Sequence, residues 1–296
     1  MLEVHRQVEF APHPAGDDEL VDVLCIGAGL AGLAAAIAAA DAGQSVFVAE
    51  PRRLSLQGGA VTEAETWATV IRRYWGADEV DEPTVEYLHK LTCDLEPPRR
   101  SHPHNELPIG SVESFDESTF DPRKPVPPFY GHEMADWARD CLTSPYGLVF
   151  SRLTPVSMSQ VRMQDGAMIR AGVVAQIPQT RRSGMTLRQW LQDMAKERGV
   201  TVHSSCAVER LLFSDGHPTG AVLETADGIR EVRARSGVLM GTSNSTADDV
   251  IARYPASILL DGRLSLVSRS ASRFARLELL TTVANVNACE LQGRLA

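Results

Sequence analysis

The sequence predicts an α/β protein that combines a Rossmann-like dinucleotide-binding domain with an inserted α+β cap domain. Three observations lead to this fold class: an early unit of strand, glycine turn, helix and strand; a late series of short strands separated by Asp-Gly turns; and a proline-rich stretch between them. The 296 residues suffice for one large domain or two of ordinary size. With 44% apolar and 23% charged residues, the composition is that of a globular protein.

The early unit occupies residues 21–50. Residues 21–26 are a short apolar run, which predicts a strand buried on both faces. Residues 30–42 are rich in alanine and leucine and stop at Gly43, as a helix with a glycine just after its end does. Residues 45–49 predict a second buried strand that ends at Glu50. Together these segments predict one βαβ unit.

The middle of the chain predicts the cap. Residues 60–92 favour helices, whereas residues 96–131 are rich in proline and predict a long loop. Residues 134–141 have the apolar spacing of a short helix. Residues 156–175 contain two apolar runs on either side of an Asp-Gly pair, which predicts a hairpin.

The last third predicts a helix over residues 187–199, a meander of strands up to residue 234 and another buried strand over 237–240. The tail, residues 271–291, favours a helix, because apolar side chains recur at helical spacing. The members of this apolar stripe are Phe274, Leu277, Leu280 and Ala284.

We therefore expect residues 1–59 and 186–296 to form the dinucleotide-binding domain. Residues 60–185 then form the cap or substrate domain, which includes the proline-rich loop over residues 96–131.

Charge and cysteine usage exclude several classes of protein. The net charge of −9 argues against a nucleic-acid partner, because phosphate recognition needs a basic face. The five cysteines contain no C-x-x-C pair, so we expect neither a metal site nor a redox dithiol, but reduced thiols in a cytoplasmic protein. The most apolar stretch, near residues 21–40, is interrupted by glycines, so we expect no membrane span.

The strongest functional signal is a glycine motif in the turn of the βαβ unit, G-x-G-x-x-G. It reads Gly27, Ala28, Gly29, Leu30, Ala31 and Gly32. In this context the first glycine allows the tight turn, the second lets the backbone approach a pyrophosphate, and the third lets the helix pack closely on the strand. The N-terminus of the helix offers N–H groups and a positive dipole end to the phosphates. Glu50 is placed to accept hydrogen bonds from ribose hydroxyls and to repel a 2′-phosphate.

At these residues the sequence resembles the flavoproteins of the fumarate reductase and succinate dehydrogenase type, and most closely their 3-ketosteroid dehydrogenase branch. Residues 23–50 followed by Gly58 and Gly59 are similar to the family's segment that contacts the diphosphate and ribityl region. Residues 187–199 and the meander are similar to the part whose backbone, here near Val208, meets adenine. Residues 237–254, including Gly241, are similar to the family's strand, flavin-facing turn and helix. The resemblance implies that FAD is the cofactor.

The sequence also departs from that family. The flavin-facing turn reads Met240-Gly241-Thr242-Ser243-Asn244, so two glycines are replaced. No counterpart of the family's C-terminal glycine-rich segment, which encloses the flavin ring, follows it. The flavin ring must then lie exposed, be covered by the proline-rich loop or be covered by another subunit. We expect another subunit, in a homo- or hetero-oligomer, and the apolar stripe of the tail offers a surface for it.

Two functions follow from these residues. The first is an FAD-dependent oxidoreductase that dehydrogenates a CH–CH bond next to a carbonyl of a small-molecule substrate, such as a steroid or another polycyclic ketone. The alternative is a non-catalytic flavin-binding subunit that supports a partner chain.

No residue is assigned a catalytic role from the sequence. Tyr130 and His132 lie at the end of the proline-rich loop, where packing explains them equally well. The arginine pairs at 52–53 and 181–182 could contact phosphate or a carboxylate but are typical of solvated surfaces. Two histidines around Pro103 have no carboxylate at ligand spacing.

Overall fold

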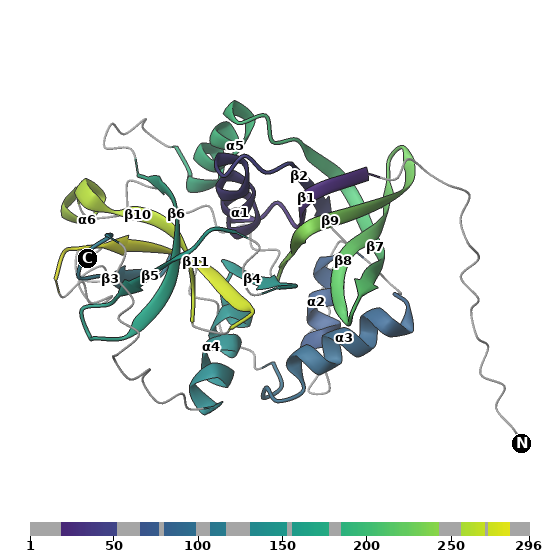
Figure 1. Cartoon of the computed structure of the whole chain (residues 1–296), viewed down its shortest axis with the longest axis horizontal. Helices are drawn as coiled ribbons and strands as arrows, with labels where there is room; N and C mark the ends of the chain where they lie inside the picture. Colours follow the sequence, from purple (N-terminus) through teal and green to yellow (C-terminus); the bar gives the residue numbers. More distant parts are fainter. Residues whose placement is uncertain are drawn as a thin grey trace, which may run out of the picture.

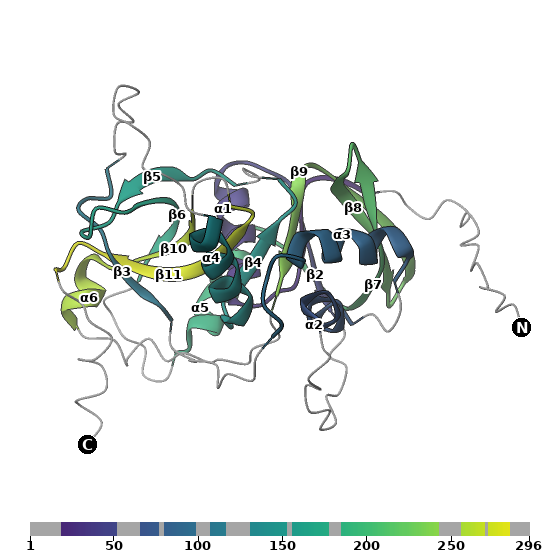
Figure 2. The ribbon, with the colours of Figure 1, turned by 90° about the horizontal axis from the view of Figure 1, so that it is seen from below.

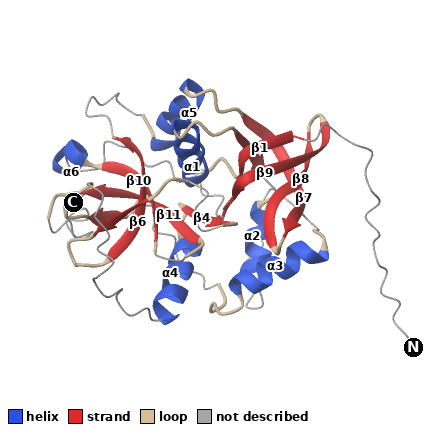
Figure 3. Cartoon of the chain, in the orientation of Figure 1, coloured by secondary structure: helices blue, strands red, loops and turns tan. Residues whose placement is uncertain are grey.

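The computed structural model describes residues 19–51, 66–76, 80–98, 107–116, 131–152, 156–177, 185–242, 256–269 and 272–284. The helices in these ranges are α1 (Leu30–Asp41), α2 (Trp67–Tyr74), α3 (Glu82–Thr92), α4 (Gly131–Thr143), α5 (Leu187–Glu197) and α6 (Ala256–Asp261). The strands are β1 (Glu19–Ile26), β2 (Val46–Pro51), β3 (Ile109–Ser111), β4 (Gly147–Phe150), β5 (Ser159–Arg162), β6 (Met168–Gln176), β7 (Val202–Ser214), β8 (His217–Thr225), β9 (Gly228–Gly241), β10 (Arg263–Ser268) and β11 (Phe274–Thr281). Figure 3 shows these helices and strands in the described part of the chain.

Five strands close into a ring of pairings. β1 pairs in parallel with β2 and with β9, and β2 pairs in parallel with β7. β8 then joins β7 to β9 by antiparallel pairing. Val23 lies opposite Val46, and Leu24 lies opposite Val238, so the late buried strand lies beside the two early ones. This confirms the predicted Rossmann-like α/β fold, in which parallel strands are brought together from distant parts of the sequence.

The sheet continues from β9 through β4, β11, β10 and β6 to β5, and β3 pairs with β11, so the described strands form one 11-stranded sheet. Strands from residues 60–185 therefore pair with strands from residues 186–296. The predicted division into a dinucleotide-binding domain and a cap stays a prediction, and the two parts share this sheet. The hairpin of β5 and β6 is present where the Asp-Gly pair predicts it.

Helices cover the two sides of the sheet. Figure 1 shows α1 and α5 above the sheet and α2, α3 and α4 below it, and Figure 2 shows the lower helices in front. Each side has its own buried apolar cluster, one built around α1 and α5 and the other around α2, α3 and α4. Most residues of α1 are buried, because their small side chains let β-strands and α5 approach this helix closely.

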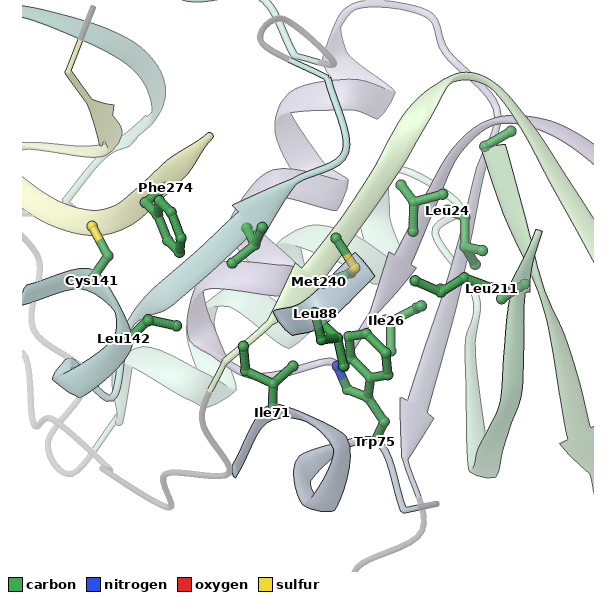
Figure 4. Packing of buried hydrophobic residues seen from close by; sticks show 14 of the residues in the cluster. Leu24, Ile26, Ile71, Trp75, Leu88, Cys141, Leu142, Leu211, Met240 and Phe274 are labelled. Carbon is green, nitrogen blue, oxygen red and sulfur yellow. The ribbon is translucent and has the colours of Figure 1, made fainter. Parts of the chain in front are cut away.

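The lower cluster fixes α2 and α3 against the ring of strands. Ile71 and Trp75 lie against Ile26 and Met240, with Leu88 of α3 beside them (Figure 4). All five side chains are at most 1% exposed. Removing one from such close-packed surroundings leaves a cavity, so this cluster holds β1 and β9 at the level where both strands end.

Two sequence predictions were wrong. The tail does not form a helix over the described residues 272–284: it contains β11, which pairs with β10, β4 and β3. The strand looks helical in sequence because both of its faces are covered, which produces a nearly continuous apolar run. Its two charged side chains, Arg276 and Glu278, form an ion pair at 2.6 Å. Since Leu277 and Leu280 are fully buried within the chain, the apolar stripe supplies no surface for another subunit.

The second difference lies in the meander. Its last strand and the buried strand predicted over residues 237–240 form one continuous strand, β9. Val21 pairs with Ala234 and Val23 with Gly237, so β9 contains one extra residue, a β-bulge, between these pairs. Gly237 has a φ of +153°, which favours glycine, and this is why the sequence shows a break there. In addition, β3 lies within the stretch that the prolines predict to be loop.

Candidate dinucleotide-binding site

The glycine turn lies between the end of β1 and the start of α1. Gly27 has a φ of +105°, and its N–H donates to the carbonyl of Ala49 at the end of β2 (2.7 Å). A Cβ on Gly27 would lie 3.6 Å from the Cα of Gly241, and a Cβ on Gly241 would lie 3.2 Å from the carbonyl oxygen of Ile26. The end of β9 therefore touches the turn directly, and the structure brings Gly27 and Gly241 together.

Gly32 keeps α1 close to the turn. A Cβ at this position would lie 1.9 Å from the carbonyl oxygen of Gly27 and 3.0 Å from its carbonyl carbon. Both atoms belong to the backbone, so they cannot swing aside as a side chain can. The third glycine of the motif is thus required by close packing of helix and turn, as the sequence predicts.

In the part of the chain that the structure describes, no side chain caps the N-terminus of α1. Its N-cap residue is Gly29, with an extended backbone and no side-chain cap, and no acidic residue lies in the first turn. Residues 28, 30, 31 and 32 are buried, whereas Gly27 and Gly29 are partly accessible. The first-turn N–H groups of a helix have no partner within the helix, and they carry its positive dipole end. An anion is the acceptor that suits this end.

Glu50 lies against the same turn. Its Oε2 accepts a hydrogen bond from the N–H of Ala28 at 2.5 Å. The sequence predicts a ribose contact for this residue, and the structure adds that the carboxylate holds the turn. A carboxylate has two oxygens, so the bond to Ala28 leaves the group able to accept from a ribose hydroxyl. Burial, followed by the charge of Glu50, raises the pKa of the neighbouring Cys206 thiol.

A positive side chain also reaches the turn. Nη1 of Arg188, the second residue of α5, donates to the carbonyl oxygen of Ala28 at 3.4 Å. Arg188 was not among the residues predicted from the sequence. Its only sequence signal is its position in the first turn of the helix predicted over residues 187–199.

Val208 lies in β7, two residues beyond Cys206, which pairs with Pro51 at the end of β2. Its N–H donates to the carbonyl of Trp75 (3.2 Å). A contact from Val208 to adenine would have to use another atom of this residue.

Thr242 follows Gly241 and is 1% exposed. Its hydroxyl has no hydrogen-bond partner among the described residues, and a Cβ on Gly147 would lie 2.5 Å from it. Such a buried hydroxyl without a partner is rare in native structures. It lies at the junction of β9 and β4, directly beside the glycine turn.

Several candidate residues cannot be placed. Gly58, Gly59, Tyr130, His102, His104 and the arginine pairs at 52–53 and 181–182 lie outside the described residues. His132 lies in the first turn of α4 and is exposed. In the described ranges, no group of three or more His, Cys, Asp or Glu side chains could hold a metal ion. No described helix has the length and apolar character needed to cross a membrane.

Comparison with protein families identifies the dinucleotide. Residues 22–124 match the model of the FAD dependent oxidoreductase family. The cofactor is FAD. The bare N-terminus of α1, the backbone contact beneath Gly32 and the carboxylate of Glu50 fit the diphosphate and ribose of FAD.

Solved structures with a similar chain include other flavoproteins. One is a flavocytochrome c3 fumarate reductase, with 18% identity, 73% of this chain and 32% of that chain covered, and a TM-score of 0.28. Another is a 3-ketosteroid-Δ4-(5α)-dehydrogenase from Rhodococcus jostii, with 21% identity and a TM-score of 0.28. The match covers 75% of this chain and 45% of that chain. The chain thus spans between a third and a half of the length of these two proteins. No curated protein matches it.

Proposed function

We propose that the chain is an FAD-dependent oxidoreductase that dehydrogenates a CH–CH bond next to a carbonyl in a small organic molecule. The observation that carries the proposal is the glycine turn, where the carboxylate of Glu50 accepts from Ala28, next to an N-terminus of α1 that has no side-chain cap. The family match over residues 22–124 supports the cofactor and the oxidoreductase class. The choice of a CH–CH bond, and of a steroid or other polycyclic ketone as the substrate, is supported by the resemblance of residues 23–50 and 237–254 to the 3-ketosteroid dehydrogenases.

The cofactor is proposed to bind along the edge of the ring where β1, β2 and β9 end. The N–H groups of residues 29–32 take the diphosphate, and Glu50 accepts from the ribose. Gly241 allows the cofactor to approach the end of β9, because a larger side chain there would press on Ile26 and Gly27. Val208, Gly58 and Gly59 are proposed to contribute further contacts.

When bound, the flavin ring supplies an acceptor for the hydride that leaves one carbon, while a proton leaves its neighbour. The described residues fix the adenosine half of the cofactor and hold the turn rigid through the bonds from Gly27 to Ala49 and from Ala28 to Glu50. This positioning is the contribution of the ring of strands to catalysis, because a hydride acceptor must be held at a defined place.

A second function is a flavin-binding subunit that supports a partner chain without catalysis. One observation favours it: the flavin-facing turn lacks two of the glycines of the resembling family, at positions 242 and 243. A homo- or hetero-oligomer, and a location in the cytoplasm, are further proposals that follow from the sequence alone.

One experiment separates the two functions. The purified full chain is loaded with FAD, freed of excess cofactor and mixed without oxygen with a saturated 3-ketosteroid. The proposed dehydrogenase loses the flavin absorbance near about 450 nm and forms an equal amount of unsaturated ketone. If FAD stays bound and oxidised with every ketone tested, the supporting role is correct; if no FAD binds, the assignment of the glycine turn is wrong.

A further inference from the structure

We propose that Arg188 belongs to the FAD site and binds the diphosphate as the positive partner of the glycine turn. The inference rests on the proposed binding of FAD at residues 27–32. Arg188 is a cation hydrogen-bonded to this turn. It touches the carbonyl of Ala28, the residue whose N–H is bonded to Glu50.

Helix α5 holds Arg188 at this place. Thr186 caps the helix through a capping box with Gln189, which fixes the first turn. Leu187 and Leu191 are at most 1% exposed and share the apolar cluster of α1. Because α5 is capped at its N-terminus and fixed against α1 along its length, the second residue of α5 stays next to the start of α1.

The charges at the turn explain what Arg188 contributes. Each phosphate of a dinucleotide carries a negative charge, and Glu50, at the end of β2, adds another where it bonds to the turn. The N-terminus of α1 offsets about half an elementary charge. A cation beside the turn therefore favours binding of the diphosphate close to this carboxylate. Arg188 places a positive charge at the turn through its contact with Ala28.

The chemistry of the guanidinium group suits this role. A guanidinium binds phosphate oxygens in a two-pronged manner that a lysine ammonium cannot reproduce. We therefore expect the charge and the planar shape of Arg188 both to matter.

The test compares Arg188→Gln and Arg188→Lys with the wild-type chain. Affinity is measured from the quenching of FAD fluorescence, and ADP and adenosine are used as competitors that contain or lack the diphosphate. We expect Arg188→Gln to raise the FAD dissociation constant about tenfold to a hundredfold, the range expected for hydrogen bonds to charged groups. The FAD dissociation constant of Arg188→Lys should lie between those of wild type and Arg188→Gln. The affinity for adenosine should be the same in all three proteins.

Arg198→Gln is the matched control, because Arg198 follows the same helix and pairs with Asp41 at 2.7 Å, away from the turn. Melting temperatures of the chains without FAD show that all variants fold. Equal FAD affinity of Arg188→Gln and wild type overturns the role of Arg188 alone. An equal loss of affinity for ADP and adenosine also overturns it, since the diphosphate would then not be the group recognised. If the wild-type chain binds no FAD, the proposed function fails and this inference fails with it.

Discussion

Replacing Gly32 by alanine tests the glycine turn at the position where the structure is most restrictive. The new Cβ would lie 1.9 Å from the carbonyl oxygen of Gly27. Heavy atoms attract best at about 3.5–4.0 Å, so helix and turn must separate by more than about an ångström. That separation moves the first-turn N–H groups away from the phosphates that they are placed to bind.

Two effects of Gly32→Ala can be given magnitudes. Overpacking costs about 1–3 kcal/mol in the free energy of unfolding, and the better helix propensity of alanine offsets up to about 1 kcal/mol of it. For the cofactor, loss of one or two charge-assisted hydrogen bonds raises the FAD dissociation constant at least about tenfold. We therefore expect a modest loss of stability and a large loss of affinity.

Gly43→Ala is the matched control at the other end of α1. Gly43 has a φ of +75°, and nothing lies within 4 Å of an added Cβ. Alanine there costs about 1–2 kcal/mol through backbone strain alone. The assay measures urea unfolding and FAD fluorescence quenching for both variants. Gly32→Ala should lose FAD affinity and Gly43→Ala should keep it; equal affinity in the two variants would refute the close-packing argument.

Two further predictions concern thiols and acid stability. Burial raises the pKa of Cys25 to about 12, so its thiol should not react in the native chain. A thiol reagent should label the exposed Cys93 in the native chain and Cys25 only after unfolding, as measured by mass spectrometry. Labelling of Cys25 before unfolding would contradict its burial. Partial burial raises the pKa of Asp261, but hydrogen bonds from Thr281 and Thr282 outweigh it and hold the pKa below the ordinary 3.8. The ionised carboxylate therefore stabilises the fold above pH 3.8. Urea unfolding should show a lower free energy of unfolding for Asp261→Asn than for wild type at pH 7. This difference in free energy should vanish as the pH falls below 3.8.

The βαβ unit could be predicted from the sequence because its information is local. The strand, the glycine turn and the helix follow one another within residues 21–42, and Gly43 ends the helix at the expected place. The place of Val238 in the same sheet as Val23 and Val46 was also predictable, because a strand buried on both faces needs apolar neighbours. Local pattern and global topology agree in this part of the chain.

The second half of the sheet could not be predicted in the same way. The partners of β11 are β10, β4 and β3, and β4 and β3 lie more than a hundred residues earlier in the sequence. The spacing of Phe274, Leu277 and Leu280 fits a helix and a strand covered on both faces equally well. The ion pair of Arg276 with Glu278 distinguishes the strand from the helix, because residues two apart share a face only in a strand. The sequence alone does not show that these two side chains meet.

The backbone geometry of the glycine turn could be predicted from the sequence, but the side chains that contact the turn could not. The glycines are required by turn geometry, which the motif encodes. The bond from Ala28 to Glu50 and the approach of Arg188 depend on how β2 and α5 pack beside the turn. These contacts arise from tertiary structure, so no spacing within residues 27–32 reveals them.

The most direct test of the account is the stoichiometry of FAD bound to the purified full chain. The protein is incubated with excess FAD and separated from free cofactor by gel filtration, and its flavin absorbance at about 450 nm is compared with the protein concentration. The account predicts one FAD for each chain in the wild type and none in Gly29→Asp, where a carboxylate would occupy the place of the phosphates. Flavin retained equally by both proteins, or by neither, would contradict the assignment of the glycine turn as the FAD site.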